Sequence, residues 1–171
     1  IREMIEFPQS NIPYSHSEKI NAYYMNFTTN GIDKIVVCYS MTDLISIYDL
    51  NGVLLKRIHG PGHFFSYFKE IHNGNVVTSL MDRDKNRDAY FCPENVGERF
   101  FVLYDGEKVN APEHDSLCDY LYSFTWDGVP DLIYELSEPI FDYTVDVNAK
   151  KIYYNFINKS SVGIMIGKKI F

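Results

Sequence analysis

The sequence predicts an all-β fold built from repeated four-stranded units. Short runs rich in β-branched and aromatic residues return in the same order along the chain. Asn-Gly or Asp-Gly pairs, which supply the positive φ of a tight hairpin turn, separate two of these runs in the first two units. The 171 residues are 46% hydrophobic and include 14 tyrosines and 12 phenylalanines, which suit half-buried pleated surfaces. We expect a single domain.

The first unit covers about residues 20–60. Its first, inner strand is expected at residues 22–27, and the β-branched run at 34–39 is typical of a buried strand. Two further strands are expected at 44–48 and 53–58. The turn Asp49-Leu50-Asn51-Gly52 lies between them, so they should pair antiparallel.

The same order of strands returns twice more. In the second unit, about residues 88–137, strands are expected at 89–92, 99–104, 120–126 and 129–136, with Asp127-Gly128 as the matching turn. In the third unit, about residues 139–171, they are expected at 140–145, 151–156, 162–166 and 168–171. About three four-stranded units in one order favour a β-propeller over a β-sandwich, the alternative that short strands leave open.

Two segments lie outside these units. Residues 1–8 fit the outer strand of a preceding blade, and residues 64–87 fit an insertion between blades. Within the insertion, residues 64–71 are expected to form a strand or a single helical turn. No long helix is expected anywhere in the chain.

Charge and cysteine content exclude several classes of protein. A net charge of −7 and a pI near 5.1 argue against nucleic acid as a partner, because phosphate binding needs clustered Lys and Arg. No apolar run approaches the roughly 18 residues of a membrane span. Cys38, Cys92 and Cys118 form neither a disulfide framework nor a metal motif. Nucleotide and phosphate fingerprints and a Gly-x-Ser-x-Gly elbow are absent from the sequence, so no cofactor is expected.

The best candidates for ligand contact are the aromatic residues of the insertion. These are Phe64, Phe65, Tyr67 and Phe68. Propellers commonly bind ligands where loops of several blades converge. The alternative is that the same side chains pack between blades and have no ligand.

Two other stretches have weaker patterns. Asp82, Asp84, Asn86 and Asp88 alternate as in a calcium loop, but Arg87 replaces the turn glycine and Pro93 the bidentate glutamate, so a solvated loop is the alternative. His59 and His63 flank Gly60-Pro61-Gly62 and offer two imidazoles, which are too few for a metal site; a bend between blades is the plainer interpretation.

Several stretches together resemble the TolB-like six-bladed propeller family of Bacteroidales. They are residues 39–52, 56–61, 88–91, 124–130, 141–146 and 151–153, in the family's order. The resemblance is to the C-terminal half of that family's members. It implies an exported protein of the periplasm or cell surface, often a lipoprotein. The chain does not begin with Met, which fits a mature or trimmed piece.

These observations predict a non-enzymatic binding module that presents one propeller face to a protein, a peptide or a glycan. Because three blades would leave open sheet faces, we expect two copies to associate or a second chain to complete the ring. One alternative is a carbohydrate-active hydrolase or lyase with two carboxyl groups in one cleft. Another is a truncated product without a function of its own.

Overall fold

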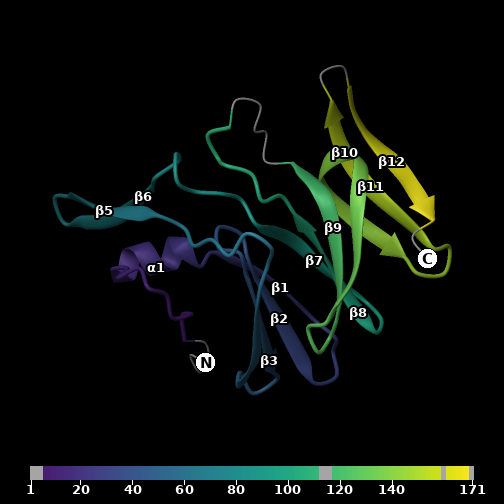
Figure 1. The fold of residues 1–171 in the computed structure, drawn as a ribbon, viewed down its shortest axis with the longest axis horizontal. Helices are drawn as coiled ribbons and strands as arrows, with labels where there is room; N and C mark the ends of the chain where they lie inside the picture. The colour runs from purple at the N-terminus through teal and green to yellow at the C-terminus, as the bar shows by residue number, and fades with distance from the viewer. Residues whose placement is uncertain (1–5, 112–116, 159–160, 170–171) are drawn as a thin grey trace.

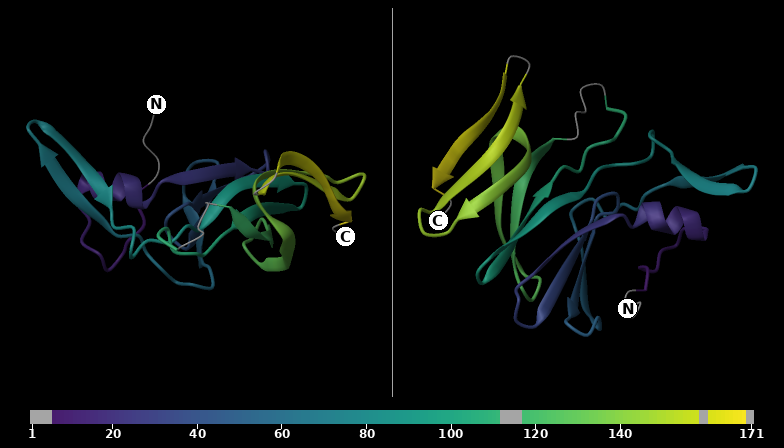
Figure 2. Two further views of the ribbon diagram at one scale, coloured as in Figure 1. Left: turned by 90° about the horizontal axis from the view of Figure 1, so that it is seen from above. Right: turned by 180° about the vertical axis from the view of Figure 1, so that it is seen from behind.

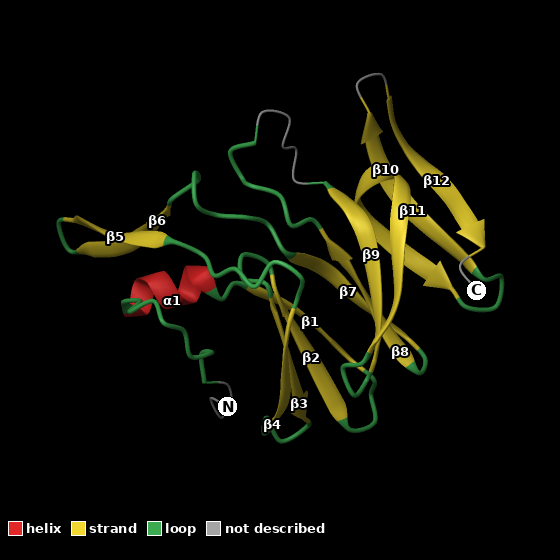
Figure 3. Cartoon of the chain, in the orientation of Figure 1, coloured by secondary structure: helices red, strands yellow, loops and turns green. Residues whose placement is uncertain are grey.

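The computed structural model describes residues 6–111, 117–158 and 161–169 and confirms the all-β prediction in its coarse form. One short helix accompanies twelve strands in this part of the chain (Figure 3). The elements are α1 His16–Ala22, β1 Met25–Thr29, β2 Lys34–Tyr39, β3 Leu44–Asp49, β4 Leu54–His59, β5 Phe68–Asn73, β6 Val76–Met81, β7 Tyr90–Val96, β8 Arg99–Tyr104, β9 Cys118–Thr125, β10 Pro130–Asp146, β11 Lys151–Asn158 and β12 Ser161–Lys169.

The strands form three antiparallel sheets. The first sheet is a meander in the order β1-β2-β3-β4, and the long sheet has the order β12-β11-β10-β9-β8-β7. A separate hairpin consists of β5 and β6. Figure 1 shows the hairpin and α1 at one side of the molecule and β10 to β12 at the other. In the described residues, no helix has the length and apolarity needed to cross a membrane.

The long sheet curls along β10, which serves two neighbours in turn. Residues Pro130 to Glu135 pair with β9, the register shifts before Ile140, and Asp142 to Asp146 pair with β11. Ile140 itself pairs with both Cys118 and Phe156. The expected strands at 129–136 and 140–145 are therefore one continuous strand. The third unit has three strands in the described residues, because β12 is continuous where two strands were expected.

Three apolar clusters hold the layers together. The inter-sheet cluster lies between the first sheet and β7 to β9 and includes Val36, Ile47, Phe100 and Phe124. The curl cluster lies inside the long sheet and includes Phe101, Leu121, Ile140 and Tyr154. The helix cluster joins the other face of the first sheet to α1 through residues such as Tyr23, Tyr39 and Leu44. The strands β2, β3 and β8 are buried on both faces as a result.

The helix α1 was not expected from the sequence. It begins at a capping box in which the Ser15 side chain accepts a hydrogen bond from the Glu18 N–H, and Glu18 Oε2 accepts one from the Ser15 N–H. This pairing satisfies two backbone donors that would otherwise lack partners. Ala22, expected to begin the first strand, instead ends α1, and β1 begins at Met25. Residues 6–8, expected in an outer strand, have no regular structure; residues 1–5 lie outside the described part.

The insertion forms the hairpin of β5 and β6. A strand begins at Phe68, while Phe64 to Tyr67 are irregular, so of the strand or helical turn expected at 64–71 only a strand from residue 68 is present. Gly74, with φ of 60°, and Asn75 make the turn between Asn73 and Val76. The hairpin contacts α1 on one face. Figure 2 shows it extending away from the sheets in both views.

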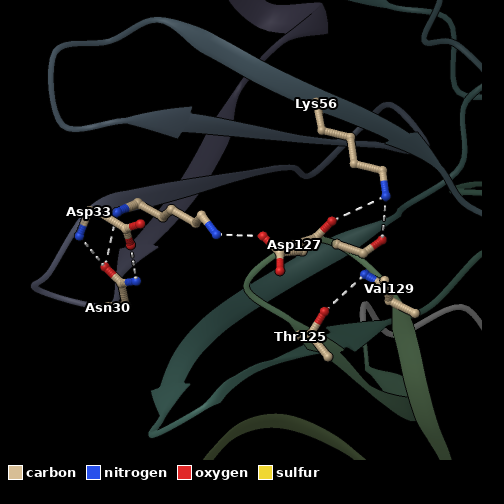
Figure 4. A network of polar contacts seen from close by, with 8 residues as sticks. Asn30, Asp33, Lys56, Thr125, Asp127 and Val129 are labelled. Atoms are coloured by element: carbon tan, nitrogen blue, oxygen red, sulfur yellow. Dashed lines mark hydrogen bonds and ion pairs between the residues drawn. The ribbon is translucent and has the colours of Figure 1, made fainter.

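A polar network joins the turn between β9 and β10 to the first sheet (Figure 4). Lys34 Nζ lies 2.5 Å from Asp127 Oδ1. Lys56 Nζ donates to the carbonyl oxygens of Asp127 and Gly128 at 3.1 and 3.2 Å. Gly128 has a φ of 69°, and an added Cβ would lie 2.4 Å from Ile58 Cδ1. The turn therefore needs glycine both for its backbone angle and for its closeness to the first sheet.

Candidate functional site

The candidate site is built around Asp43, which is fully buried at the start of β3. Its Oδ2 accepts hydrogen bonds from the N–H groups of Gly62 and His63, both at 2.7 Å. Its Oδ1 accepts one from the Tyr90 hydroxyl at 2.9 Å. A buried carboxylate is tolerated where several donors replace its water. Asp43 thereby ties the turn after β4 to the first strand of the long sheet.

The turn after β4 follows this carboxylate closely. A Cβ added to Gly60 would lie 1.9 Å from Asp43 Oδ1 and 2.1 Å from the Tyr90 hydroxyl. Only glycine leaves room for the two side chains to meet. The backbone also closes on Asp43, since the Gly60 N–H donates to the Asp43 carbonyl at 3.3 Å. The turn from His59 to Pro61 is thus fixed in place beside the long sheet.

This turn forms one wall of a pocket of about 260 Å³ between the two sheets. The first sheet and its turn contribute Ile58, His59, Gly60 and Pro61, and the long sheet contributes Tyr90, Tyr122, Ser123, Phe124, Pro130, Leu132 and Ile133. Apart from the tyrosine hydroxyls, polar side chains come from His59 and Ser123 alone. The lining is therefore mainly aromatic and aliphatic, as in pockets that receive apolar groups.

The polar groups near the pocket are already engaged. Burial and the nearby Asp43 carboxylate raise the pKa of Tyr90, so its phenol stays protonated and donates to Asp43. The Ser123 hydroxyl donates to Asp131 Oδ2 at 3.2 Å. Asp131 in turn pairs with Arg99 at 3.1 Å. The pocket lining includes no carboxylate, and His59 is its one imidazole.

The four aromatic residues expected at a contact surface do not share one surface. Phe64 packs against the inter-sheet cluster, whereas Phe68 packs against the helix cluster. Phe65 lies with its ring centroid 5.8 Å from that of His59, edge to face. Tyr67 is exposed, with Lys85 Nζ 5.5 Å from its ring centroid. At Phe64 and Phe68 the structure agrees with packing, the alternative that the sequence left open.

The acidic series of the insertion is dispersed among separate contacts. Asp82 pairs with Lys85 at 3.1 Å, and Asp84 accepts a hydrogen bond from Asn110 at 2.5 Å. The buried Asn86 side chain donates to the carbonyl of Tyr67 and accepts from its N–H. Asp88 is buried. Searched over the described residues, the structure contains no group of three or more His, Cys, Asp or Glu able to hold a metal ion.

The two histidines of the turn do lie together. The rings of His59 and His63 stack with centroids 5.3 Å apart and planes 21° from parallel. Both side chains are exposed, and His63 has a φ of 48°. The backbone bend that holds them donates two N–H groups to Asp43.

A second, more open pocket of about 420 Å³ is lined by Arg87, Asp105, Gly106, Glu107, Lys108 and Ala111. Asp105 Oδ1 accepts a hydrogen bond from the Glu107 N–H at 3.0 Å. Arg87 donates to the Gly106 carbonyl at 2.8 Å. These bonds shape the turn after β8 and leave two acidic and two basic side chains at one opening.

Neither the known protein-family models nor the curated proteins match this chain.

Sequence reasoning missed the role of Asp43, which holds the turn that forms one wall of the pocket. The residues of the pocket come from four separate segments, so no local motif marks them. One signal was present: glycines on both sides of Pro61, directly after a strand, indicate a backbone that approaches another group closely.

Proposed function

We propose that this chain is a non-enzymatic binding module whose inter-sheet pocket receives an apolar side chain of a protein or peptide ligand. One observation carries the proposal, namely an aromatic and aliphatic pocket of about 260 Å³ whose walls are held by the buried Asp43. A preformed pocket loses little entropy when it is occupied. Its size suits one leucine, proline or phenylalanine side chain.

The chemistry of the lining favours a peptide over a glycan. A sugar ring presents hydroxyl groups that need hydrogen-bond partners, and those lost to water without replacement weaken binding. The free polar groups at this pocket are few, because Ser123 donates to Asp131 and Tyr90 to Asp43. An apolar side chain makes no such demand.

As part of the same proposal, the sheets are blades of a propeller that radiate from a shared axis. Contacts between first strands support this arrangement, since Asn95 Nδ2 in β7 donates to the Thr29 carbonyl in β1 at 2.9 Å. Between the first strands of the second and third units, Thr144 Oγ1 in β10 donates to Glu94 Oε1 in β7 at 2.7 Å. The first sheet and the curled far part of the long sheet, which pack on opposite faces of β8, also fit blades.

The outer face of the first sheet supports association with a second copy or another chain. Phe27, which shares this face with Val37, is exposed. Arg57 lies opposite Ser46, and its buried Nε has no hydrogen-bond partner among the described residues. A further sheet would cover the apolar residue and supply an acceptor.

Export to the periplasm or cell surface is also part of the proposal, and it rests on the resemblance alone. Fractionation of cells that make the full protein tests it.

The test of the pocket uses capped amino acids as probes. Burying one leucine side chain contributes about 1.5 to 3 kcal/mol, so N-acetyl-leucine amide and N-acetyl-phenylalanine amide should bind weakly, in the millimolar range. Methyl-selective NMR spectra recorded during titration should show shifts of the pocket methyl groups of Ile58, Leu132 and Ile133. N-acetyl-aspartate amide should leave these signals unchanged.

A matched pair of variants locates the binding. Ile133 in β10 is 65% exposed and lines the pocket, whereas Val129, directly before β10, is 53% exposed and does not. Ile133→Asp should abolish the shifts of the Ile58 and Leu132 methyls, because a charge at the pocket disfavours apolar ligands. Val129→Asp should preserve them. Equal effects of the two substitutions, or no shift with either apolar probe, would show that the pocket is not the site.

The carbohydrate-cleaving alternative is favoured by one observation, the presence of Asp105 and Glu107 at the opening of the second pocket. Paired carboxyl groups at suitable separation serve glycoside hydrolysis. Its test is the release of reducing ends from a panel of polysaccharides. Activity that disappears in Glu107→Gln but persists in Glu98→Gln would replace the binding proposal with a catalytic one.

A further inference from the structure

We propose that β6 is a self-pairing edge, through which two copies of this chain join their hairpins into one four-stranded antiparallel sheet. The observation behind this inference is an exposed, uncharged edge strand on a two-stranded hairpin. It is independent of the pocket and of the stacking of sheets proposed above.

The composition of β6 is that of an unprotected edge. Val76–Met81 reads Val-Val-Thr-Ser-Leu-Met and contains no charged residue. Exposed edge strands normally carry charges or proline that prevent pairing with other chains. The edge strand β4 of the first sheet follows that rule with Lys56 and Arg57, and β5 carries Lys69 and Glu70. In β6, Val76 is 63% exposed and Leu80 62% exposed.

The two edges of the hairpin differ in whether another element bonds to their backbone. The Glu70 N–H points away from β6, because it donates to Glu18 Oε1 of α1 at 3.1 Å. The edge of β5 is thus partly occupied by the helix. No strand in the described residues pairs with the outer edge of β6.

The direction of the backbone groups on β6 follows from the same ladder. The Asp82 N–H donates to the Tyr67 carbonyl, which marks that pair as hydrogen-bonded. Since such pairs alternate with non-hydrogen-bonded ones, Ser79, opposite Glu70, and Val77, opposite His72, direct their N–H and C=O groups outward. Two outward residues at an interval of two are what a second antiparallel strand requires.

The sequence of β6 is complementary to itself about Thr78. When Val77 pairs with Ser79 of the second copy, and the reverse, four backbone hydrogen bonds form. Thr78 then faces Thr78, and Val76 faces Leu80, so the exposed apolar side chains cover each other on one face. Asp82, the acid that directly follows β6 in the sequence, is paired with Lys85 at 3.1 Å. A second copy therefore fits this edge despite the net charge of −7.

Disulfide trapping tests the register directly. In a non-hydrogen-bonded antiparallel pair the Cα atoms lie about 4.5 Å apart, within the range that a disulfide spans. Thr78→Cys should form a disulfide between two copies under mild oxidation, identified by mass spectrometry as residue 78 to residue 78. Val76→Cys is the matched control, because it is exposed on the same face but would face Leu80. The yield of the disulfide between two copies should be at least tenfold lower for Val76→Cys than for Thr78→Cys.

Charge provides the second test. Thr78→Lys places two ammonium groups opposite each other, and its exposed position leaves the fold of one copy intact. Sedimentation equilibrium up to about millimolar protein should detect a weak dimer, since so small an interface lies below the usual size of stable ones. The substitution should weaken that dimer at least tenfold, whereas Ile32→Lys, in the turn after β1, should not.

The outcomes separate this edge from the outer face of the first sheet. Phe27→Lys should disrupt association through that face and leave disulfide formation at residue 78 unchanged. Equal trapping at positions 76 and 78 would mean random collision and would overturn the inference. Absence of the dimer in the unsubstituted chain, or a dimer unaffected by Thr78→Lys, would overturn it as well.

Discussion

The strands β8 and β6 have the same length but differ in burial. Each has six residues and is largely apolar, but β8 is buried from Phe100 to Tyr104, whereas most of β6 is exposed. In β8, Phe100 and Val102 enter the inter-sheet cluster, and Phe101 and Leu103 enter the curl cluster. The difference teaches that stacked neighbours, rather than the strand's own residues, decide how much a strand contributes to stability.

The largest effect on the free energy of unfolding is expected when a buried side chain of β8 is shortened. Phe100 is fully buried, and its ring stacks on Phe124 with centroids 5.2 Å apart. Phe100→Ala should lower the free energy of unfolding by about 3 to 5 kcal/mol through lost contacts and a cavity. Urea denaturation followed by circular dichroism measures it. Leu80→Ala in β6 should change it by less than about 0.5 kcal/mol; similar losses for the two would contradict the comparison.

The buried carboxylate between the sheets should rank second. Asp43→Ala removes the acceptor of the Gly62, His63 and Tyr90 donors and leaves all three unsatisfied. We expect a loss of about 3 kcal/mol, because the buried Tyr90 hydroxyl is left unpaired and two part-buried N–H groups lose their acceptor as well. Urea denaturation again provides the measurement. In the same variant the pocket methyl groups should shift in NMR spectra, while those of Ile71 and Leu80 in the hairpin should not.

Two turn glycines make the third test, one in each region. Both have positive φ, but a Cβ on Gly128 would lie within 2.7 Å of Ile58 and Ile47, whereas one on Gly74 meets nothing within 4 Å. Gly74→Ala should cost about 1 kcal/mol of backbone strain alone. Gly128→Ala should cost about 1 to 3 kcal/mol more because of overpacking. Equal shifts of the urea midpoint for the two substitutions would show that the turn between β9 and β10 moves to accommodate the added Cβ at little cost.

The sequence sufficed for those parts of the fold that local patterns specify. The turns at Asn51-Gly52 and Asp127-Gly128 and the strands β2, β3, β8 and β9 lie within a residue or two of their predicted positions. The errors arose where tertiary context overrides local signals. Nothing local shows that β10 passes from β9 to β11 without a break, or that two strands of the third unit merge into β12.

The candidate site was less accessible to sequence reasoning for the same reason. Asp43 and Tyr90 are 47 residues apart and meet only when the first sheet packs on the long sheet. The helix α1, in contrast, was open to prediction, because Ser15 and Glu18 have the spacing of a capping box. The run of aromatic residues from Phe64 to Phe68 attracted attention by composition, but its irregular backbone up to Tyr67 places Phe64 and Phe68 in two different clusters.

The smallest effect concerns the ion pair that joins the two sheets at their surface. Lys34, 2.5 Å away, lowers the pKa of Asp127 below its ordinary value of 3.8, through a hydrogen bond and charge. A lowered folded-state pKa stabilises above the ordinary value, and this contribution is lost as pH falls through the folded-state pKa. Asp127 raises the pKa of Lys34 above 10.5, so that contribution is present below 10.5 and is lost only as pH rises through the raised value.

The stabilisation by this pair is therefore complete near pH 7 and disappears in acid. Lys34→Met should lower the urea midpoint slightly at pH 7, and the difference should shrink as the pH falls through the lowered pKa of Asp127. High salt at pH 7 should reduce the difference, because the pair is exposed and screened. Lys69→Met on β5 supplies the control, since its lysine is exposed on the hairpin and does not join the sheets. A deficit in Lys34→Met that persists in acid would assign the loss to the packing of the lysine stem rather than to its charge.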